Sequence, residues 1–170
     1  MYTCNTERMI DKIAAFSKFG DAGRGGITRF SLSPEDHLAR NEFATRMEKI
    51  GAAIECDDMA NIYATLPGSD PAAKRIAMAS HSDSVQNGGN YDGILGVIAA
   101  MEVLETIASE KIPHRHPLTA MIWTNEEGSL FPPAMMSSGV ITGRFDKEKM
   151  LASKSRLDPG ITFGAVLEAS

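Results

Sequence analysis

The chain has 170 residues, of which 43% are hydrophobic and 23% charged, a composition that suits one soluble globular domain with one substantial core. Its formal net charge of −5 at pH 7, with no cluster of Lys and Arg, argues against nucleic acid as a partner. No apolar stretch approaches the roughly 20 residues that cross a bilayer, and the first residues lack the apolar run of a signal peptide, so we expect a cytoplasmic protein with no membrane partner.

Two helices are predicted in the first third of the chain. The first spans residues 6–16, where apolar residues recur at helical spacing, namely Met9, Ile10, Ile13 and Phe16. The second begins after Ser33, a favourable N-cap that is followed by Pro34 and by two acids in the first turn. Gly51 is expected to end this helix. Its expected apolar side consists of Leu38, Phe43, Met47 and Ile50.

Strands and one further helix alternate along the middle of the chain. Strands are predicted at residues 53–56, 62–66, 75–80 and 118–124, and a helix with a wide apolar face at residues 93–108. The last strand is apolar nearly throughout, as expected when helices cover both of its faces. Because a strand, a helix and a strand of these lengths form a βαβ unit, the last two strands should be parallel. The pattern predicts the α/β class, as a three-layer α/β/α sandwich with a mostly parallel mixed sheet.

Polar residues gather where the two strands of this βαβ unit end. The first strand is followed by His81 and Asp83, and Asp92 stands where the next helix begins. The second strand is followed by Glu126 and Glu127. In open α/β sheets, ligands bind beyond the carboxyl ends of the strands. One imidazole and several carboxylates at that edge could bind zinc, manganese or a similar divalent ion.

Each of these residues also has a structural explanation. A single histidine such as His81 is more often hydrogen-bonded than a metal ligand, and Asp92 could simply cap its helix. The pair Glu126 and Glu127 could be solvated surface. Their combination at neighbouring strand ends favours a shared site, but spacing alone leaves a metal site and a set of structural residues both open.

The other histidines and the two cysteines are not expected to complete a site. His114 and His116 precede the strand at residues 118–124 and so belong to its amino end, on the wrong edge of the sheet. His37 lies on an early helix and is expected at the surface. Cys4 and Cys56, without a secretory signal, are expected to remain unbonded, which fits a reducing cytoplasm.

Two strings in the sequence resemble a known enzyme family. ASHSDSVQNGGNYDG and TNEEGSLFPPAMMSSGVITG are similar to motifs of the di-zinc amidohydrolases related to aminoacylases and glutamate carboxypeptidases. More narrowly, they resemble the branch that contains N-carbamoyl-L-amino-acid hydrolases, β-ureidopropionases and allantoate amidohydrolases. The resemblance covers the whole chain, from GGITRFSLSPEDHLAR through DPGITFGAVLEAS, and implies a zinc-exopeptidase-like catalytic domain.

The resemblance implies a role for each polar residue at the strand ends. It implies two divalent metal ions, zinc or manganese, with cobalt or nickel as alternatives. His81 would bind one ion, Asp92 would bridge both, and Glu127 would bind the other. Glu126 would be the general base, and Asp83 would orient His81. Three departures from the usual family pattern are Ser82 for an aliphatic residue, Gln86 for a proline and Leu130 for an arginine.

The resemblance also implies that this chain is incomplete. Residues 1–170 would form the N-terminal part of the catalytic domain, without the dimerisation or lid domain and without the C-terminal part. The missing metal ligands would come from a later His-x-Glu-Gln segment and a histidine near the C-terminus, so we expect this chain alone to be inactive.

The full-length protein implied by the resemblance would be a homodimer that hydrolyses the carbamoyl C–N bond of an N-carbamoyl-L-amino acid or related ureido substrate. Two alternatives remain: an allantoate amidohydrolase, and a non-catalytic module that binds a metal or a partner. A peptide-cleaving relative is disfavoured by the NGG-x-YDG loop.

Overall fold

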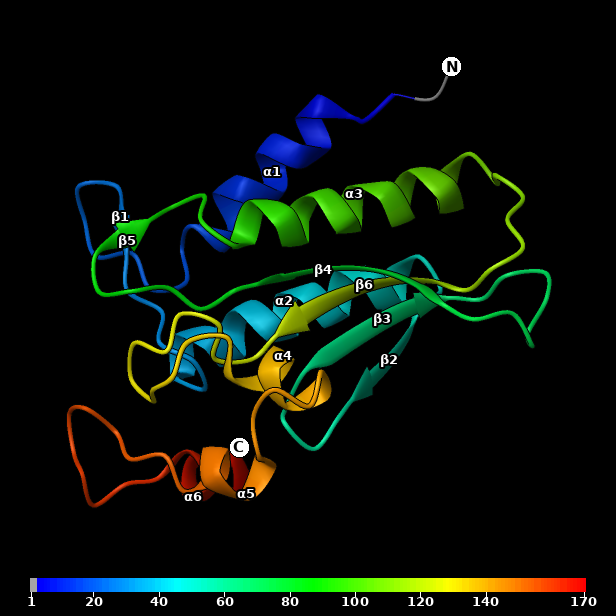
Figure 1. The fold of residues 1–170 in the computed structure, drawn as a ribbon. Coiled ribbons are helices and arrows are strands. Elements are labelled where there is room, and N and C mark those ends of the chain that lie inside the picture. The colour runs from blue at the N-terminus through cyan, green and yellow to red at the C-terminus, as the bar shows by residue number, and fades with distance from the viewer. Residues whose placement is uncertain (1–2) are drawn as a thin grey trace.

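The computed structural model describes residues 3–170. Its helices and strands follow in the order α1 (Thr6–Phe16), β1 (Gly26–Ile27), α2 (Pro34–Lys49), β2 (Ala53–Cys56), β3 (Ile62–Leu66), β4 (Ile76–His81), β5 (Gly88–Gly89), α3 (Ile94–Ser109), β6 (Leu118–Trp123), α4 (Met136–Ile141), α5 (Lys147–Leu151) and α6 (Phe163–Glu168) (Figure 1). The predicted strands and the first three helices are confirmed, with bounds that agree to within one or two residues. The short helices α4 to α6 were not predicted.

The central sheet has the strand order β2-β3-β6-β4. β4 and β6 are parallel, in register from Ile76 opposite Leu118 to His81 opposite Trp123, and α3 connects them. The predicted βαβ unit and the α/β class with a mixed sheet are therefore confirmed. The pairs β2–β3 and β3–β6 are antiparallel, so within this chain the sheet is less parallel than expected. The short connection between β2 and β3 explains the first of these, because parallel strands need a long crossover.

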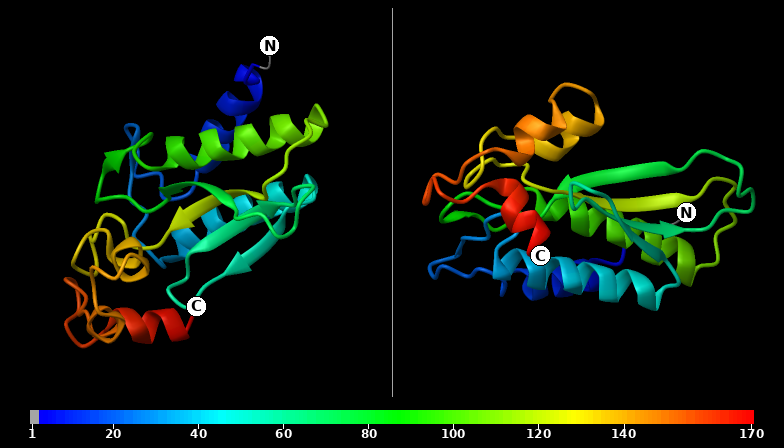
Figure 2. Two further views of the ribbon diagram at one scale, coloured as in Figure 1. Left: turned by 45° about the vertical axis from the view of Figure 1, so that its right-hand side comes forward. Right: turned by 90° about the horizontal axis from the view of Figure 1, so that it is seen from below.

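One face of the sheet carries the main hydrophobic core. α3 packs against β4 and β6 while α2 packs against β2 and β3, and Figure 2 shows both helices on the same side of the sheet. The core includes Phe43, Met47, Ala64, Val97, Ile98, Met101, Leu104, Ala120 and Ile122. On the opposite face of β4, Ala77 and Ala79 are exposed. A second helical layer over β4 is therefore not formed by residues 3–170.

Helix α2 has the predicted ends but a different buried side. Ser33 accepts a hydrogen bond from the backbone N–H of Asp36, and Gly51 follows the helix with a φ of +84°. Leu38 is 53% exposed, so its assignment to the apolar side is wrong. The buried stripe runs instead through Asp36, Ala39, Arg40, Phe43 and Met47. A search for apolar residues alone misses this stripe, because two of its members are charged and pair with each other.

A smaller second core lies under the C-terminal helices. Its buried members are Leu32, Met59, Ala60, Phe131, Met136 and Phe163. The Phe131 carbonyl accepts a hydrogen bond of 2.7 Å from the side chain of Asn125, the residue before Glu126. This core therefore anchors the loop that carries the two candidate glutamates.

Two further predictions concern the chain as a whole. Cys4 and Cys56 are both exposed and unbonded, as expected. No helix within residues 3–170 is long and apolar enough to cross a membrane.

A buried ionic cluster joins α1 to α3. The Lys12 ammonium is fully buried and contacts both Glu102, at 3.0 Å, and Glu105, and Arg8 bonds Glu102 at 2.6 Å. Burial by itself raises the pKa of Glu102, but hydrogen bonds from Arg8, Asn5 and Lys12 outweigh it and lower the pKa to about 2. The ionised form of Glu102 is thus favoured in the folded state, and α1 is held to α3 by charge as well as by apolar contact.

We expect Glu102→Gln to reduce the free energy of unfolding by about 3 kcal/mol at pH 7. Because the folded-state pKa lies below the ordinary value of 4.5, this contribution is complete above pH 4.5 and is lost as the pH falls toward 2. Urea unfolding at pH 7, 4.5 and 2.5 would measure the difference. Glu42→Gln serves as the control, because its ion pair with Arg46 is partly exposed and should contribute less than about 1 kcal/mol. Equal losses for both variants, or a Glu102→Gln loss independent of pH, would contradict this account.

Candidate functional site

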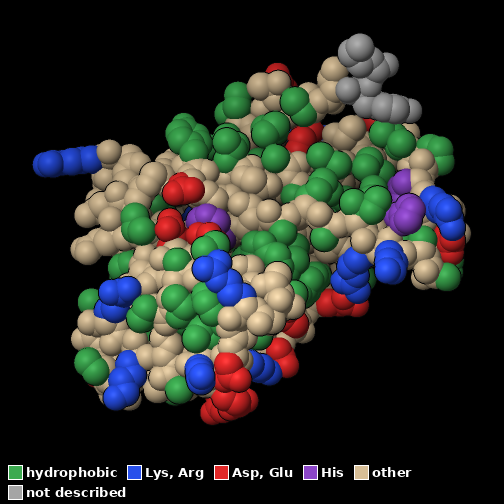
Figure 3. Space-filling model, in the orientation of Figure 1, with side chains coloured by type: hydrophobic (Ala, Val, Ile, Leu, Met, Phe, Trp, Pro, Cys, Tyr) green, Lys and Arg blue, Asp and Glu red, His purple; other side chains and the backbone are tan. Residues whose placement is uncertain are grey.

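The candidate site lies where β4 and β6 end side by side. Since His81 is in register with Trp123, the loops that follow the two strands leave the sheet at the same edge. Figure 3 shows a histidine surrounded by acidic side chains on this face of the molecule. The parallel pairing is the reason that residues more than forty positions apart in sequence meet here.

The imidazole of His81 lies at the centre of this group. Its Nε2 atom is 3.5 Å from Oε2 of Glu126 and 4.0 Å from Oδ1 of Asp92. The His81 side chain is 11% exposed, whereas that of Asp92 is 70% exposed. Glu127 lies close enough for His81, Asp92 and Glu126 all to influence its pKa. The structure thus brings together the four residues predicted as ligands and base.

Asp83 lies behind this group and contacts both loops. Its backbone carbonyl is 2.9 Å from Nδ1 of His81, while its carboxylate oxygen Oδ1 is 3.7 Å from that nitrogen. The carboxylate accepts hydrogen bonds from the backbone N–H groups of Glu126, at 3.2 Å, and Glu127, at 3.1 Å. The nearer contact of Asp83 to His81 is therefore its carbonyl and not its carboxylate, and the carboxylate holds the backbone of the two glutamates.

The structural explanations of single residues fit less well. α3 begins at Ile94 and its N-cap is Gly93, with no side-chain hydrogen bond at the cap, so Asp92 is not the helix cap. The side chain of Glu126 is 29% exposed, and Glu127 is likewise half-buried, so the pair is not simply solvated surface.

Negative charge dominates the site. Burial raises the pKa of Asp83 to about 6, and nearby Asp36 adds to this, while His81 and the backbone N–H groups of the glutamates oppose it. Burial also raises the pKa of Glu127, and Asp92 and Glu126 raise it further against the opposing effect of His81. Several acids therefore share a site with one histidine, and a bound cation would offset their repulsion.

The imidazole and carboxylate groups of the site are of the types that bind a divalent metal ion, but their atoms do not form a complete ligand set. Imidazole nitrogen and carboxylate oxygen are the usual ligands of zinc and manganese. Two metal bonds of about 2.1 Å can join atoms no more than about 4.2 Å apart, so the His81–Asp92 separation of 4.0 Å is near that limit. Within residues 3–170, no three His, Cys, Asp or Glu side chains stand close enough to hold an ion.

Comparison with known proteins finds similarity to hydrolases. Residues 61–138, which include all five candidate residues, match the family described as peptidase family M28. The chain is 36% identical over 165 residues to an N-carbamoyl-L-amino-acid amidohydrolase of Rhizobium meliloti and 32% identical over 160 residues to an allantoate amidohydrolase of Bacillus subtilis (strain 168). A crystal structure of a hydantoinase/carbamoylase family amidase from Burkholderia ambifaria superposes with a TM-score of 0.94 at 35% identity over 98% of this chain.

This chain resembles part of the hydantoinase/carbamoylase amidohydrolases in sequence and in fold. It spans only part of its relatives: 96% of the chain matches 39% of the Rhizobium protein, and the Burkholderia structure is matched over 40% of its length. The resemblance that was inferred from the two motifs is confirmed, and so is the α/β class with a mixed sheet.

Two departures from the usual carbamoylase pattern have visible consequences. The Ser82 hydroxyl donates a hydrogen bond of 2.7 Å to the fully buried carboxylate of Asp36. Leu130 packs against the second core and so takes part in loop packing. The sequence motifs predicted neither contact. For the Ser82–Asp36 hydrogen bond, the available signal was the pair of opposite charges at Asp36 and Arg40, four residues apart on one helix.

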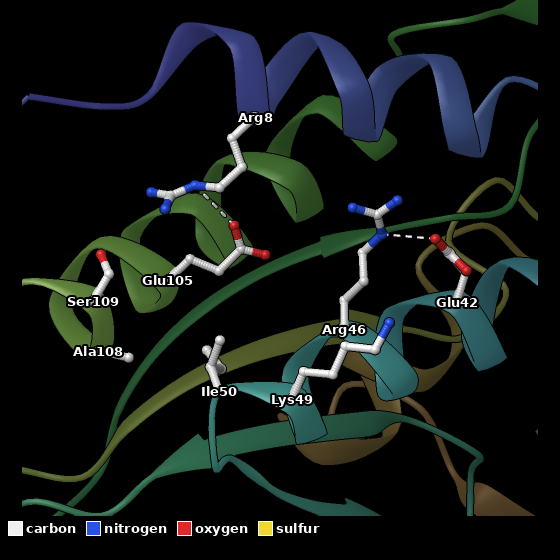
Figure 4. A pocket seen from close by; sticks show the side chains of 8 residues that line it. All are labelled: Arg8, Glu42, Arg46, Lys49, Ile50, Glu105, Ala108 and Ser109. Carbon is white, nitrogen blue, oxygen red and sulfur yellow. Dashed lines mark hydrogen bonds and ion pairs between the residues drawn. The ribbon is translucent and has the colours of Figure 1, made fainter.

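Other parts of the chain that could hold a ligand lie away from this edge. His114 and His116 lie before β6, at the opposite end of that strand, as predicted. Nδ1 of His114 is 2.9 Å from the carbonyl oxygen of His116, and Nδ1 of His116 is 2.7 Å from the carbonyl oxygen of Lys74, just before β4. A surface depression of about 550 Å³ lies between α1, α2 and the end of α3 (Figure 4). Its two arginines already pair with glutamates, Arg8 with Glu105 and Arg46 with Glu42, so they leave little free charge for a ligand.

The ring of His81 rests directly on the backbone of Gly93. Gly93 has a φ of +66°, and a Cβ atom there would overlap the imidazole. We expect Gly93→Ala to displace His81 and to lower the free energy of unfolding by about 2 kcal/mol or more. Gly89→Ala is the control, because a Cβ at Gly89 meets nothing within 4 Å, and it should cost less than about 1 kcal/mol. Chemical denaturation of both variants, with a histidine NMR spectrum, would test this. An unmoved His81 signal in Gly93→Ala would contradict it.

Proposed function

We propose that this chain supplies part of the two-metal centre of an amidohydrolase, and that the complete protein hydrolyses the carbamoyl C–N bond of an N-carbamoyl-L-amino acid. The observation that carries the proposal is the meeting of one imidazole and three carboxylates at the ends of β4 and β6. Its support from comparison is the similarity to N-carbamoyl-L-amino-acid amidohydrolases over 96% of the chain.

In this proposal each residue has one task. His81, Asp92 and Glu127 would hold two divalent ions, zinc or manganese, with Asp92 as the shared ligand. When bound, the ions would lower the pKa of a water molecule and polarise the scissile carbonyl. The carboxylate of Glu126 would accept a proton from the attacking water and would return it to the leaving nitrogen.

Asp83 is a positioning residue in the same scheme. Its carbonyl fixes the ring of His81, and its carboxylate fixes the backbone of the adjacent glutamates. Neighbouring residues can then point in different directions, so that Glu127 faces an ion while Glu126 faces the water. Removing such a supporting contact commonly weakens metal binding about 10-fold to 100-fold.

The ligand count limits what this chain does alone. A catalytic zinc usually has about three protein ligands and a water. Here one ion would have His81 and Asp92 and the other Asp92 and Glu127, so each is one ligand short. We therefore propose weak metal binding and negligible turnover for the chain as given, with a homodimeric, cytoplasmic complete protein.

An allantoate amidohydrolase is the second candidate for the complete protein. The similarity to the Bacillus subtilis enzyme, 32% over 160 residues, is close to that of the carbamoylases. Assays with N-carbamoyl-L-amino acids and with allantoate, run in parallel on a chain extended to the length of its relatives, distinguish the two.

The isolated chain should bind zinc or manganese at well below two ions per molecule and should not hydrolyse N-carbamoyl-L-amino acids measurably. Metal analysis after dialysis and an ammonia-release assay with added metal give the two readouts. His116→Ala is the control, because His116 lies at the far end of β6 and its loss should not change metal content. Robust turnover by the 170-residue chain would overturn the ligand count.

In an extended chain, Glu126→Gln and Glu127→Gln should have different effects. Glu126→Gln should keep both ions but lose activity by about 100-fold or more, because an amide cannot accept the proton. Glu127→Gln should instead lower the metal content, because a ligand is weakened. Metal analysis and steady-state kinetics on both variants separate these outcomes, and equal metal loss in both would refute the division of roles.

A further inference from the structure

We propose that the Asp36–Arg40 ion pair of α2 is a clamp that fixes the spacing of the two loops that carry the candidate site. The inference rests on the proposed function for its purpose, but the contacts themselves are independent of it. Asp36 reaches the loop after β4, and Arg40 reaches the end of β6. Neither residue contacts the candidate ligands themselves, so both are positioning residues.

Asp36 forms the first half of the clamp. Its side chain is fully buried and accepts hydrogen bonds from the Ser82 hydroxyl at 2.7 Å, the backbone N–H of Leu32 at 2.9 Å and the Arg40 guanidinium at 2.7 Å. Ser82 stands between His81 and Asp83, so this bond holds the middle of the loop that carries them. Arg29, itself 2% exposed, donates to the Ser82 carbonyl at 2.7 Å from another side.

Arg40 forms the second half. Its guanidinium donates to the hydroxyl of Thr124 at 3.0 Å and to the carbonyl of Ala60 at 2.7 Å, and the residue is 4% exposed. Thr124 lies two residues before Glu126. The ion pair thus connects the loop of His81 to the loop of the two glutamates through a short chain of buried bonds, with α2 as its rigid support.

The chemistry of the Asp36–Arg40 pair suits the positioning of the two loops better than a large contribution to stability. A buried ion pair gives little net stability, because desolvation offsets the attraction, but its bonds are directional. Both carboxylate oxygens of Asp36 are engaged, and so are three guanidinium nitrogens of Arg40. Such a fully bonded network has one favourable geometry, and sites of this kind lose function when their support loosens by about 1 Å.

The test uses the two ends of the clamp, because changes to Asp36 or Arg40 could prevent folding. Ser82→Ala and Thr124→Val each remove one buried hydroxyl in the 170-residue chain. Thr119→Val is the matched control: Thr119 is on β6 and fully buried, and its hydroxyl bonds Thr65 at 2.9 Å, away from the site. Thr124→Ser keeps the hydroxyl and should behave as the parent chain.

The first readout is amide hydrogen exchange at Glu126 and Glu127, whose N–H groups bond Asp83 across the two loops. Exchange at these amides should accelerate by about 10-fold in Ser82→Ala and Thr124→Val and by less than about 2-fold in Thr119→Val. The second readout is zinc affinity, measured by competition with a coloured chelator, which should fall by about 10-fold in the same two variants.

The two readouts separate failure of the clamp from failure of the proposed function. The clamp would be overturned if amide exchange at Glu126 and Glu127 is unchanged in Ser82→Ala and Thr124→Val, or if it rises equally in Thr119→Val. This conclusion would hold for any measured zinc affinity. Faster exchange confined to the two clamp variants, with recovery in Thr124→Ser, supports the clamp. If that pattern appears and a chain extended to the length of its relatives binds no zinc, the clamp stands and the metal-dependent function does not.

Discussion

The parallel pairing of β4 with β6 is the constraint on which the candidate site depends. A sheet puts the carboxyl ends of neighbouring parallel strands at one edge, so the residues after each strand are brought together. An antiparallel pairing, such as that between β3 and β6, would have placed the two polar loops at opposite edges. The crossover through α3 enforces the parallel arrangement, and the start of α3 brings Asp92 to the same edge.

The site combines a closely packed half with a more exposed half. His81 is held by the carbonyl of Asp83 and by the backbone of Gly93, and Asp83 is nearly fully buried. Asp92 and Glu126 are more exposed, and nothing comparable fixes their carboxylates. The fixed imidazole of His81 therefore lies beside carboxylates that are partly or largely open to solvent.

Much of the fold followed from the sequence because its signals are local. Helix caps such as Ser33, the apolar run of β6 and the strand lengths require no knowledge of distant partners. Leu38 was misplaced because the buried side of α2 contains Asp36 and Arg40, whose burial makes sense only once Ser82 and Thr124 are known as partners. The antiparallel placement of β3 beside β6 also depends on pairing between distant segments, which periodicity does not encode.

In the candidate site, too, the residue types could be read from the local sequence, whereas the contacts between distant residues could not. Residue types at the strand ends identified His81, Asp92, Glu126 and Glu127, and the two motifs gave them roles. The contact of Asp83 could not be assigned in the same way, because a residue type does not say whether its carbonyl or its carboxylate approaches the ring. In the structure the two groups act on different loops, and a single residue thereby ties the direction of His81 to the backbone of the glutamates. The buried pair on α2 ties the same loops from the other side, so the spacing of the site is determined twice, by bonds that arise from three separate stretches of the chain.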